Sequence, residues 1–154
     1  MKLLSEFVSK ILVLLISITA ISIALLFLNP IIDRNLNSIS IQEAISNMKK
    51  IEAISKEVLS EAIGSQRVLE IRIHRGILYV SNNSFVYILE SDNIPLEDFT
   101  RRDGNLLIEK IGNTFSITLN FEYANIIGNI YLSSGNHRIC ILKNAELTIK
   151  VYIC

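Results

Sequence analysis

The sequence contains no tryptophan, and only two prolines, six glycines, two cysteines and two histidines among its 154 residues. Low proline and glycine content excludes a disordered or low-complexity chain, because such chains are rich in these residues and poor in apolar ones. Two cysteines are too few for a disulfide scaffold. The 15 basic and 15 acidic residues cancel, so no net charge attracts nucleic acid or an acidic substrate. The length predicts one folded domain.

Residues that commonly carry catalysis or hold metals are also scarce. His74 and His137 fall in different predicted hairpins, and neither has Asp, Glu or Cys near it at metal-ligand spacing. The sequence has no glycine-rich phosphate loop, no nucleophile elbow and no pair of spaced carboxylates. Its basic residues form no patch with aromatic ones. We therefore expect no enzyme, no cofactor, no metal site and no nucleic-acid partner.

What the sequence has in excess is one apolar stretch near its start. No residue from Ile11 to Leu28 is charged, which corresponds to roughly 27 Å of helix, close to the ~30 Å core of a bilayer. The end of the stretch lacks the small residues that signal peptidase prefers, so we expect it to be retained. Lys2 and Lys10 precede it and belong on the cytoplasmic side. The sequence thus predicts a single-pass membrane protein with a cytoplasmic N-terminus and an extracellular head.

Small residues occur at spacings that suit contacts between helices. Ala20 and Ala24 lie four residues apart, as do Ser5 and Ser9, and small residues at this spacing let helices approach closely. Together with Ile16 in the same run, Ser9, Ala20 and Ala24 are the candidate helix-packing residues. The alternative is that the small polar residues simply tolerate apolar surroundings, because hydroxyls can bond back to the carbonyl four residues earlier.

The period of the apolar residues changes twice after Pro30. Between residues 39 and 66 they recur at helical spacing, and Gly64 supplies a stop, which predicts an amphipathic helix packed against the following sheet. Its expected apolar stripe consists of Ile41, Ala44, Ile45, Met48, Ile51, Val58 and Ala62, with Ser55 filling the gap. After Gly64 the period is two, as in half-buried strands. The stretch 84–90 is apolar on both faces, which predicts a central strand.

Short strands joined by turn residues predict an antiparallel β-sandwich-like or open-barrel head of about eight strands. The stretches 126–132 and 138–142 are read as one strand each, and 91–105 as a long connection. The expected fold class is α+β, with a long N-terminal helix that first spans the membrane and then becomes amphipathic. The expected domains are a leader over 1–10, a transmembrane helix over 11–29, a helical extension over 30–63 and the head over 64–154.

Two modifications are considered for the head. Cys140 and Cys154 are candidates for a disulfide, because the head is expected outside the reducing cytoplasm. A hairpin turning at Asn144–Ala145 would instead place Cys140 opposite Ile149, so a bond requires another geometry. Asn82 begins an Asn-x-Ser sequon in a predicted turn and is a candidate for glycosylation. Neither the disulfide nor the use of Asn82 follows from the sequence.

The start of the chain resembles a known family. Leu4-Ser5-Glu6-Phe7-Val8, followed by the apolar run 11–16, is similar to the start of archaeal type IV pilins. The resemblance implies that Ser5 and Glu6 take part in processing and assembly, and that a membrane peptidase cuts before the apolar helix. The family usually has a glycine before the cut, whereas here no glycine precedes Gly64, so the position and the existence of a cut stay open. The stretch from Gly64 to Glu90 also looks like the head of small archaeal pilin-like proteins.

From this resemblance we expect a structural subunit of an archaeal surface filament that assembles through its N-terminal apolar helix. Its expected partners are the membrane, copies of itself, and other pilins or a cell-envelope protein. The alternative is a membrane-anchored extracellular β domain that binds a cell-envelope partner and does not polymerise.

Overall fold

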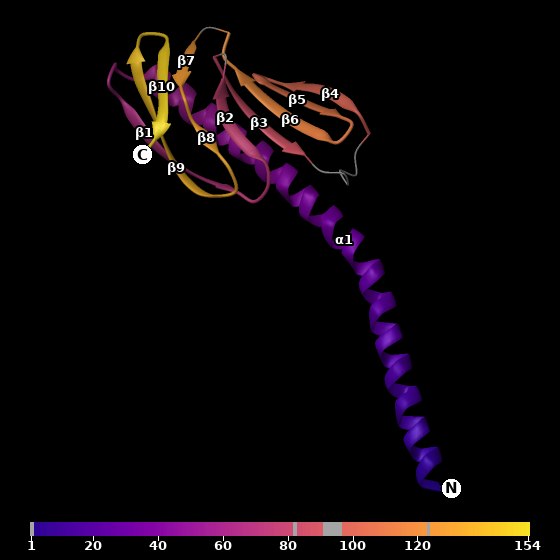
Figure 1. The fold of residues 1–154 in the computed structure, drawn as a ribbon. Helices are drawn as coiled ribbons and strands as arrows, with labels where there is room; N and C mark the ends of the chain where they lie inside the picture. The colour runs from indigo at the N-terminus through magenta and orange to yellow at the C-terminus, as the bar shows by residue number, and fades with distance from the viewer. Residues whose placement is uncertain (1, 82, 91–96, 123) are drawn as a thin grey trace. The chain divides into compact units, whose positions relative to one another are not determined.

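The computed structural model describes residues 2–81, 83–90, 97–122 and 124–154, and only the backbone of 2–7, 9 and 27–34. The chain divides into two compact units, Met1–Leu36 and Asn37–Cys154. One helix, α1 (Lys2–Ser60), contributes to both units, and the strands follow it (Figure 1). The strands are β1 (Gln66–Ile73), β2 (Ile77–Ser81), β3 (Ser84–Glu90), β4 (Phe99–Asp103), β5 (Leu106–Ile111), β6 (Thr114–Asn120), β7 (Asn125–Gly128), β8 (Tyr131–Leu132), β9 (Gly135–Ala145) and β10 (Thr148–Ile153).

The expected membrane span over residues 11–29 is wrong. Crossing the ~30 Å core of a bilayer takes about 20 consecutive, predominantly apolar residues. Within the part of the chain that the structure describes, no helix is both long and apolar enough to do so. The single-pass location, with a cytoplasmic N-terminus and an extracellular head, depended on that span and is corrected with it.

The part of α1 in the second unit is amphipathic, as its sequence period predicts. Ile41, Ala44, Met48, Ile51 and Val58 are buried, and they join the hydrophobic core of this unit. These residues recur every three or four positions, so they lie on one face of the helix. The predicted stripe is therefore confirmed over this length, whereas Ala62 lies beyond the end of α1 and is exposed.

The strands form two sheets, and their number and pairing differ from the expected antiparallel, sandwich-like or open-barrel head of about eight strands. The four-stranded sheet has the order β1-β9-β10-β7, and the six-stranded sheet has the order β4-β5-β6-β3-β2-β8. All described pairings are antiparallel except that of β10 with β7, which is parallel. The expected strand count and the purely antiparallel arrangement are therefore wrong, because β4 lies within the expected connection and β7 and β8 divide the expected strand 126–132.

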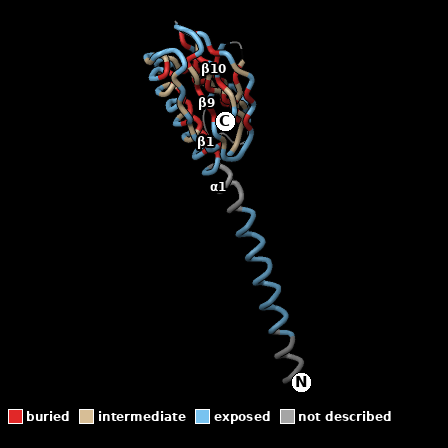
Figure 2. Tube along the Cα trace, turned by 90° about the vertical axis from the view of Figure 1, so that its left-hand side faces the viewer, coloured by how far each residue is buried: buried red, intermediate tan, exposed pale blue. Residues whose placement is uncertain are grey.

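The core lies between the inward faces of these elements. Phe85, Tyr87 and Leu89 of β3 are buried and belong to one cluster with residues of α1 and of both sheets. Figure 2 shows this buried interior in red. Between them, Val86 and Ile88 point to the other face and are half-buried. β3 lies between β6 and β2, so the prediction of a central strand is confirmed.

A tight turn joins β1 to β2 and depends on one glycine. Gly76 has a φ of 95°, in the region that side chains disfavour. A Cβ atom at this position would also lie 2.5 Å from the carbonyl oxygen of Ile88. Only glycine therefore allows β2 to approach β3 this closely at the start of the hairpin.

Candidate self-association surface

The first unit presents apolar side chains on every side of its helix. We call the described side chains of Val8 and residues 10–26 the apolar helix surface. Its large hydrophobic side chains are all exposed, by 45 to 73 %. In Figure 2 the tube of residues 10–26 is pale blue throughout. The exposed hydrophobic residues are Val8, Ile11, Leu12, Val13, Leu14, Leu15, Ile16, Ile18, Ile21, Ile23, Leu25 and Leu26.

The polar side chains within this surface are satisfied by the helix itself. The Ser17 hydroxyl donates to the Val13 carbonyl at 2.8 Å, and the Ser22 hydroxyl donates to the Ile18 carbonyl at 2.9 Å. Thr19 donates to the carbonyls of residues 15 and 16 at 3.0 and 2.9 Å. A hydroxyl bonded in this way loses little when it leaves water, because it keeps its hydrogen bond. Among the described side chains of the surface, Lys10 carries the single charge.

The structure places the sequence-predicted assembly residues as follows. Ile16, Ala20 and Ala24 are exposed on α1, and Ala20 and Ala24 lie about one helical turn apart. The side chains of Ser5, Glu6 and Ser9 lie outside the described residues. Asn82 also lies outside them, so the structure gives no account of the glycosylation candidate. The described surface therefore offers a partner apolar contacts, and Lys10 is the one charged group among its described side chains.

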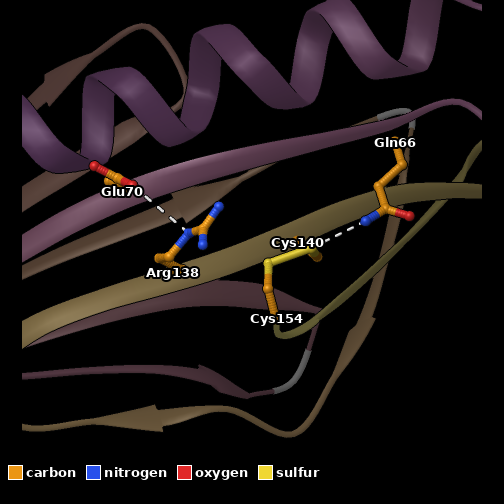
Figure 3. The surroundings of a disulfide bond; sticks show 5 residues. All are labelled: Gln66, Glu70, Arg138, Cys140 and Cys154. Atoms are coloured by element: carbon orange, nitrogen blue, oxygen red, sulfur yellow. Dashed lines mark hydrogen bonds and ion pairs between the residues drawn. A yellow bond between two sulfur atoms is a disulfide. The ribbon is translucent and has the colours of Figure 1, made fainter.

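Cys140 and Cys154 form a disulfide in the second unit (Figure 3). Their Cα atoms are 5.5 Å apart, within the usual range for such bonds. The expected register is wrong, because Cys140 of β9 pairs with Tyr152, and Ile149 pairs with Lys143. The hairpin turn lies at residues 146–147, between Ala145 at the end of β9 and Thr148 at the start of β10, which is two residues later than expected. This later turn brings the end of β10, and Cys154 after it, alongside Cys140. Gln66 donates from Nε2 to the sulfur of Cys140 at 3.0 Å.

His74 lies in the turn between β1 and β2, whereas His137 lies in β9, and the two contact different partners. His74 contacts the Glu43 carboxylate through Nδ1, and its backbone N–H donates to the same oxygen at 3.3 Å. His137 contacts the Ser133 carbonyl through Nε2 at 2.7 Å. Within the described ranges, no three His, Cys, Asp or Glu side chains converge as metal ligands would.

Next to His74, the turn between β1 and β2 accepts a hydrogen bond from the buried Tyr87. Tyr87 donates its hydroxyl proton to the carbonyl oxygen of Arg75, and the Arg75 guanidinium donates to Asn37 Oδ1 at 2.9 Å. Burial, with a smaller contribution from the negative charge of Glu43, raises the pKa of Tyr87 to about 12. The hydroxyl therefore stays neutral at ordinary pH and fixes the turn between β1 and β2.

Lys143 is a buried cation that the sequence analysis missed. Its side chain is 8 % exposed, and its ammonium group donates to the carbonyls of Leu59 and Glu61 at 2.7 and 2.6 Å. Helix C-termini carry partial negative charge and unsatisfied carbonyls, so a cation there is stabilising. The period of two in Ile139, Ile141 and Lys143 already places all three on the inward face, which was the available signal. The role of Lys143 is structural.

Comparison of the chain with models of protein families, with curated proteins and with solved structures gives no match. The resemblance to archaeal type IV pilins therefore stays a prediction from the sequence.

Proposed function

We propose that the protein is a structural subunit that assembles with copies of itself into a filament through the apolar helix surface. The observation that carries the proposal is the exposure of every large hydrophobic side chain described in this segment. Contiguous exposed apolar patches beyond a few hundred Å² are rare on monomers and usually mark interaction sites. The self-bonded hydroxyls support it as well, because they allow burial without unpaired donors.

The free energy gained by burying the apolar helix surface is comparable to the cost of association. Complete burial of a Val, Leu or Ile side chain contributes about 1.5–3 kcal/mol, and these side chains are about half exposed. Each therefore contributes roughly 0.8–1.5 kcal/mol, which gives on the order of 10–20 kcal/mol for the whole surface as an upper estimate. The loss of translational and rotational freedom costs about 4–15 kcal/mol per association event. The two ranges overlap, so burial of most of the surface is required.

This requirement favours an assembly larger than a dimer. One neighbouring helix covers a stripe along one face, as in a two-stranded coiled coil. Here Leu12, Val13 and Leu14 point in different directions around the helix axis, about 100° apart, and are all exposed. Several neighbours are needed to cover all of them, and repeated heterologous contacts that do not close into a ring extend into a filament.

The alternative from the sequence, a membrane-anchored β domain that binds a cell-envelope partner, is kept only in part. An anchored β domain that does not polymerise would need the membrane span that is corrected above. Binding of a partner by the second unit stays a prediction that is compatible with a filament subunit.

The test compares two isoleucine-to-lysine variants of the full chain. Ile16 lies in the apolar helix surface and is 59 % exposed, whereas Ile111, at the end of β5 in the second unit, is 66 % exposed. Ile16→Lys places a charge where neighbouring helices would meet, and Ile111→Lys places the same charge at an equally exposed site elsewhere. Sedimentation velocity and negative-stain electron microscopy in detergent-free buffer measure the assembly.

We expect polymers from the parent chain and from Ile111→Lys, and monomers from Ile16→Lys. Ala20→Asp should act like Ile16→Lys for the same reason. Circular dichroism and thermal unfolding check that each variant retains its folded second unit. The proposal would be contradicted if the parent chain stayed monomeric. It would also be contradicted if Ile16→Lys assembled over the same range of protein concentration as the parent chain.

A further inference from the structure

A cavity of about 580 Å³ lies in the second unit over β2, β3 and β8 of the six-stranded sheet. The alternation of the strands places it on the outer face of this sheet. Leu78 and Val80 of β2 are buried on the inner face, so Ile77 and Tyr79 point outward. Ile88 of β3 points to the same side. The volume falls within the range of about 300–1,000 Å³ that is typical of small-molecule sites.

The floor of this cavity is apolar and partly aromatic. Ile77 pairs with Ile88, and Tyr79 pairs with Tyr131, so each pair lies side by side on the outer face. Directly opposed side chains on neighbouring strands have Cβ atoms about 4.5–5.5 Å apart, so Tyr79 and Tyr131 occupy neighbouring positions on this face. Tyr131 is 65 % exposed although it is large and aromatic. Its ring is thus available to pack against a ligand.

The rim supplies hydrogen-bonding groups but no excess of one charge. The Arg75 guanidinium is bonded to Asn37, and His74 is in contact with the Glu43 carboxylate. Glu90 and Ser134 also line the cavity, and both are exposed. A strongly anionic or cationic ligand would meet groups of both signs here, so the rim favours a neutral ligand. Hydroxyl and carboxylate oxygens on the rim suit a ligand with many hydroxyl groups.

We propose that this cavity binds a neutral sugar. A pyranose ring has one face of C–H groups, which packs on aromatic and aliphatic side chains, and a periphery of hydroxyls that both donate and accept hydrogen bonds. The floor formed by Tyr79, Tyr131, Ile77 and Ile88 matches the apolar face. The Glu90 carboxylate accepts from ligand hydroxyls, and the hydroxyls of Ser134 and the two tyrosines donate or accept. Neither assembly nor the apolar helix surface enters this inference.

The experiment is saturation-transfer difference NMR on the full chain with cellobiose, maltose and N,N′-diacetylchitobiose as separate probes. This measurement detects weak ligands and tolerates a large assembled receptor. We expect transfer to the ring protons of at least one disaccharide. Tyr131→Ala removes one aromatic ring from an exposed position and should weaken binding about tenfold. Ile127→Ala, at a 52 % exposed residue of β7 in the other sheet, should leave binding within twofold.

Each result bears on the proposal. Absence of transfer to all three disaccharides would overturn it, and so would an equal loss of binding in Tyr131→Ala and Ile127→Ala. The short apolar peptide N-acetyl-Val-Ile-Val-amide is a further probe. Transfer to this peptide, with none to the sugars, would mean that the cavity binds an extended peptide, and it would overturn the sugar proposal. Thermal unfolding of Tyr131→Ala shows whether the fold is intact. We expect an intact fold, because truncation of an exposed side chain rarely costs more than about 0.5 kcal/mol of stability. If Tyr131→Ala is unfolded, Glu90→Gln, with an expected loss of severalfold, takes its place.

Discussion

Replacement of Lys143 by methionine tests how the end of α1 is held to the four-stranded sheet. The ammonium group of Lys143 donates to two carbonyls at the C-terminal end of the helix, those of Leu59 and Glu61. The backbone of Lys143 also exchanges hydrogen bonds with Gly64 and Ser65, each at 2.9 Å. Methionine has similar length and no donor, so Lys143→Met removes the side-chain bonds and leaves the backbone bonds in place.

The expected loss follows from three contributions. A hydrogen bond from a charged donor contributes about 1.5–3 kcal/mol, and the two carbonyls lose theirs together. The favourable interaction of a cation with the helix C-terminus, about 0.3–1 kcal/mol, is also lost. Against this, methionine avoids the desolvation of a buried ammonium, which costs several kcal/mol. We expect a net loss of about 2–3 kcal/mol in the free energy of unfolding.

Urea unfolding followed by circular dichroism measures this loss, and thermal unfolding provides a second reading. For a unit of about 120 residues the entropy of unfolding is roughly 0.25 kcal/mol per kelvin, so the midpoint should fall by about 8–12 °C. Lys150→Met is the matched control, because Lys150 is exposed on β10 and its loss should change stability by less than about 0.5 kcal/mol. Equal stability of the two variants would refute the assignment of Lys143 as the helix cap.

Two further predictions concern Tyr87 and the disulfide. Because the pKa of Tyr87 is raised to about 12 in the folded chain, the unfolded chain ionises first. Its stabilising contribution is therefore complete below about pH 10 and is lost as the pH rises through about 12, by roughly 3 kcal/mol in all and about 1.4 kcal/mol by pH 11. Urea unfolding at pH 7 and pH 11 should show this extra loss in the parent chain and not in Tyr87→Phe, which is about 1 kcal/mol less stable at pH 7; equal pH dependence would contradict it. Replacement of both Cys140 and Cys154 by alanine should cost about 3 kcal/mol, given their separation of 14 residues, and an unchanged urea midpoint without reductant would count against this.

Local patterns in the sequence predicted the local structure well. The 3–4 spacing of Ile41, Ala44, Met48, Ile51 and Val58 determines one face of a helix, and that face is buried. The run of apolar residues in 84–90, which leaves both faces apolar, predicted a central strand, and β3 is flanked by strands on both sides. These predictions succeed because periodicity depends only on neighbouring residues.

Pairings between distant segments could not be predicted in this way. β7 and β10 pair in parallel, and nothing in either segment distinguishes a parallel from an antiparallel partner. The sequence also did not show that the hairpin turn lies at residues 146–147, and this position brings Cys154, rather than Ile149, next to Cys140. β4 was missed because its residues are mostly exposed and polar, as suits a strand at the edge of a sheet.

The two candidate sites also differ in whether their residues are close together in the sequence. The apolar helix surface is a continuous run of sequence, so composition was sufficient to find it, although the expected membrane span was wrong. The cavity brings together β2, β3 and β8, and Tyr131 faces Tyr79 only because two residues of β8 pair with β2. Its floor could not be recognised without that pairing.

The two proposals can be tested against each other because their residues lie in different units of the chain. Ile16→Lys should abolish assembly and leave the affinity for the disaccharide unchanged. Tyr131→Ala should weaken the disaccharide and leave assembly unchanged. If Ile16→Lys also abolished sugar binding, the cavity would have to depend on assembly, and its floor within one subunit would not be sufficient. If Tyr131→Ala also blocked assembly, the exposed ring of Tyr131 would instead be part of the contact between subunits. Only independent losses support both the apolar helix surface as the assembly site and the cavity as a separate binding site.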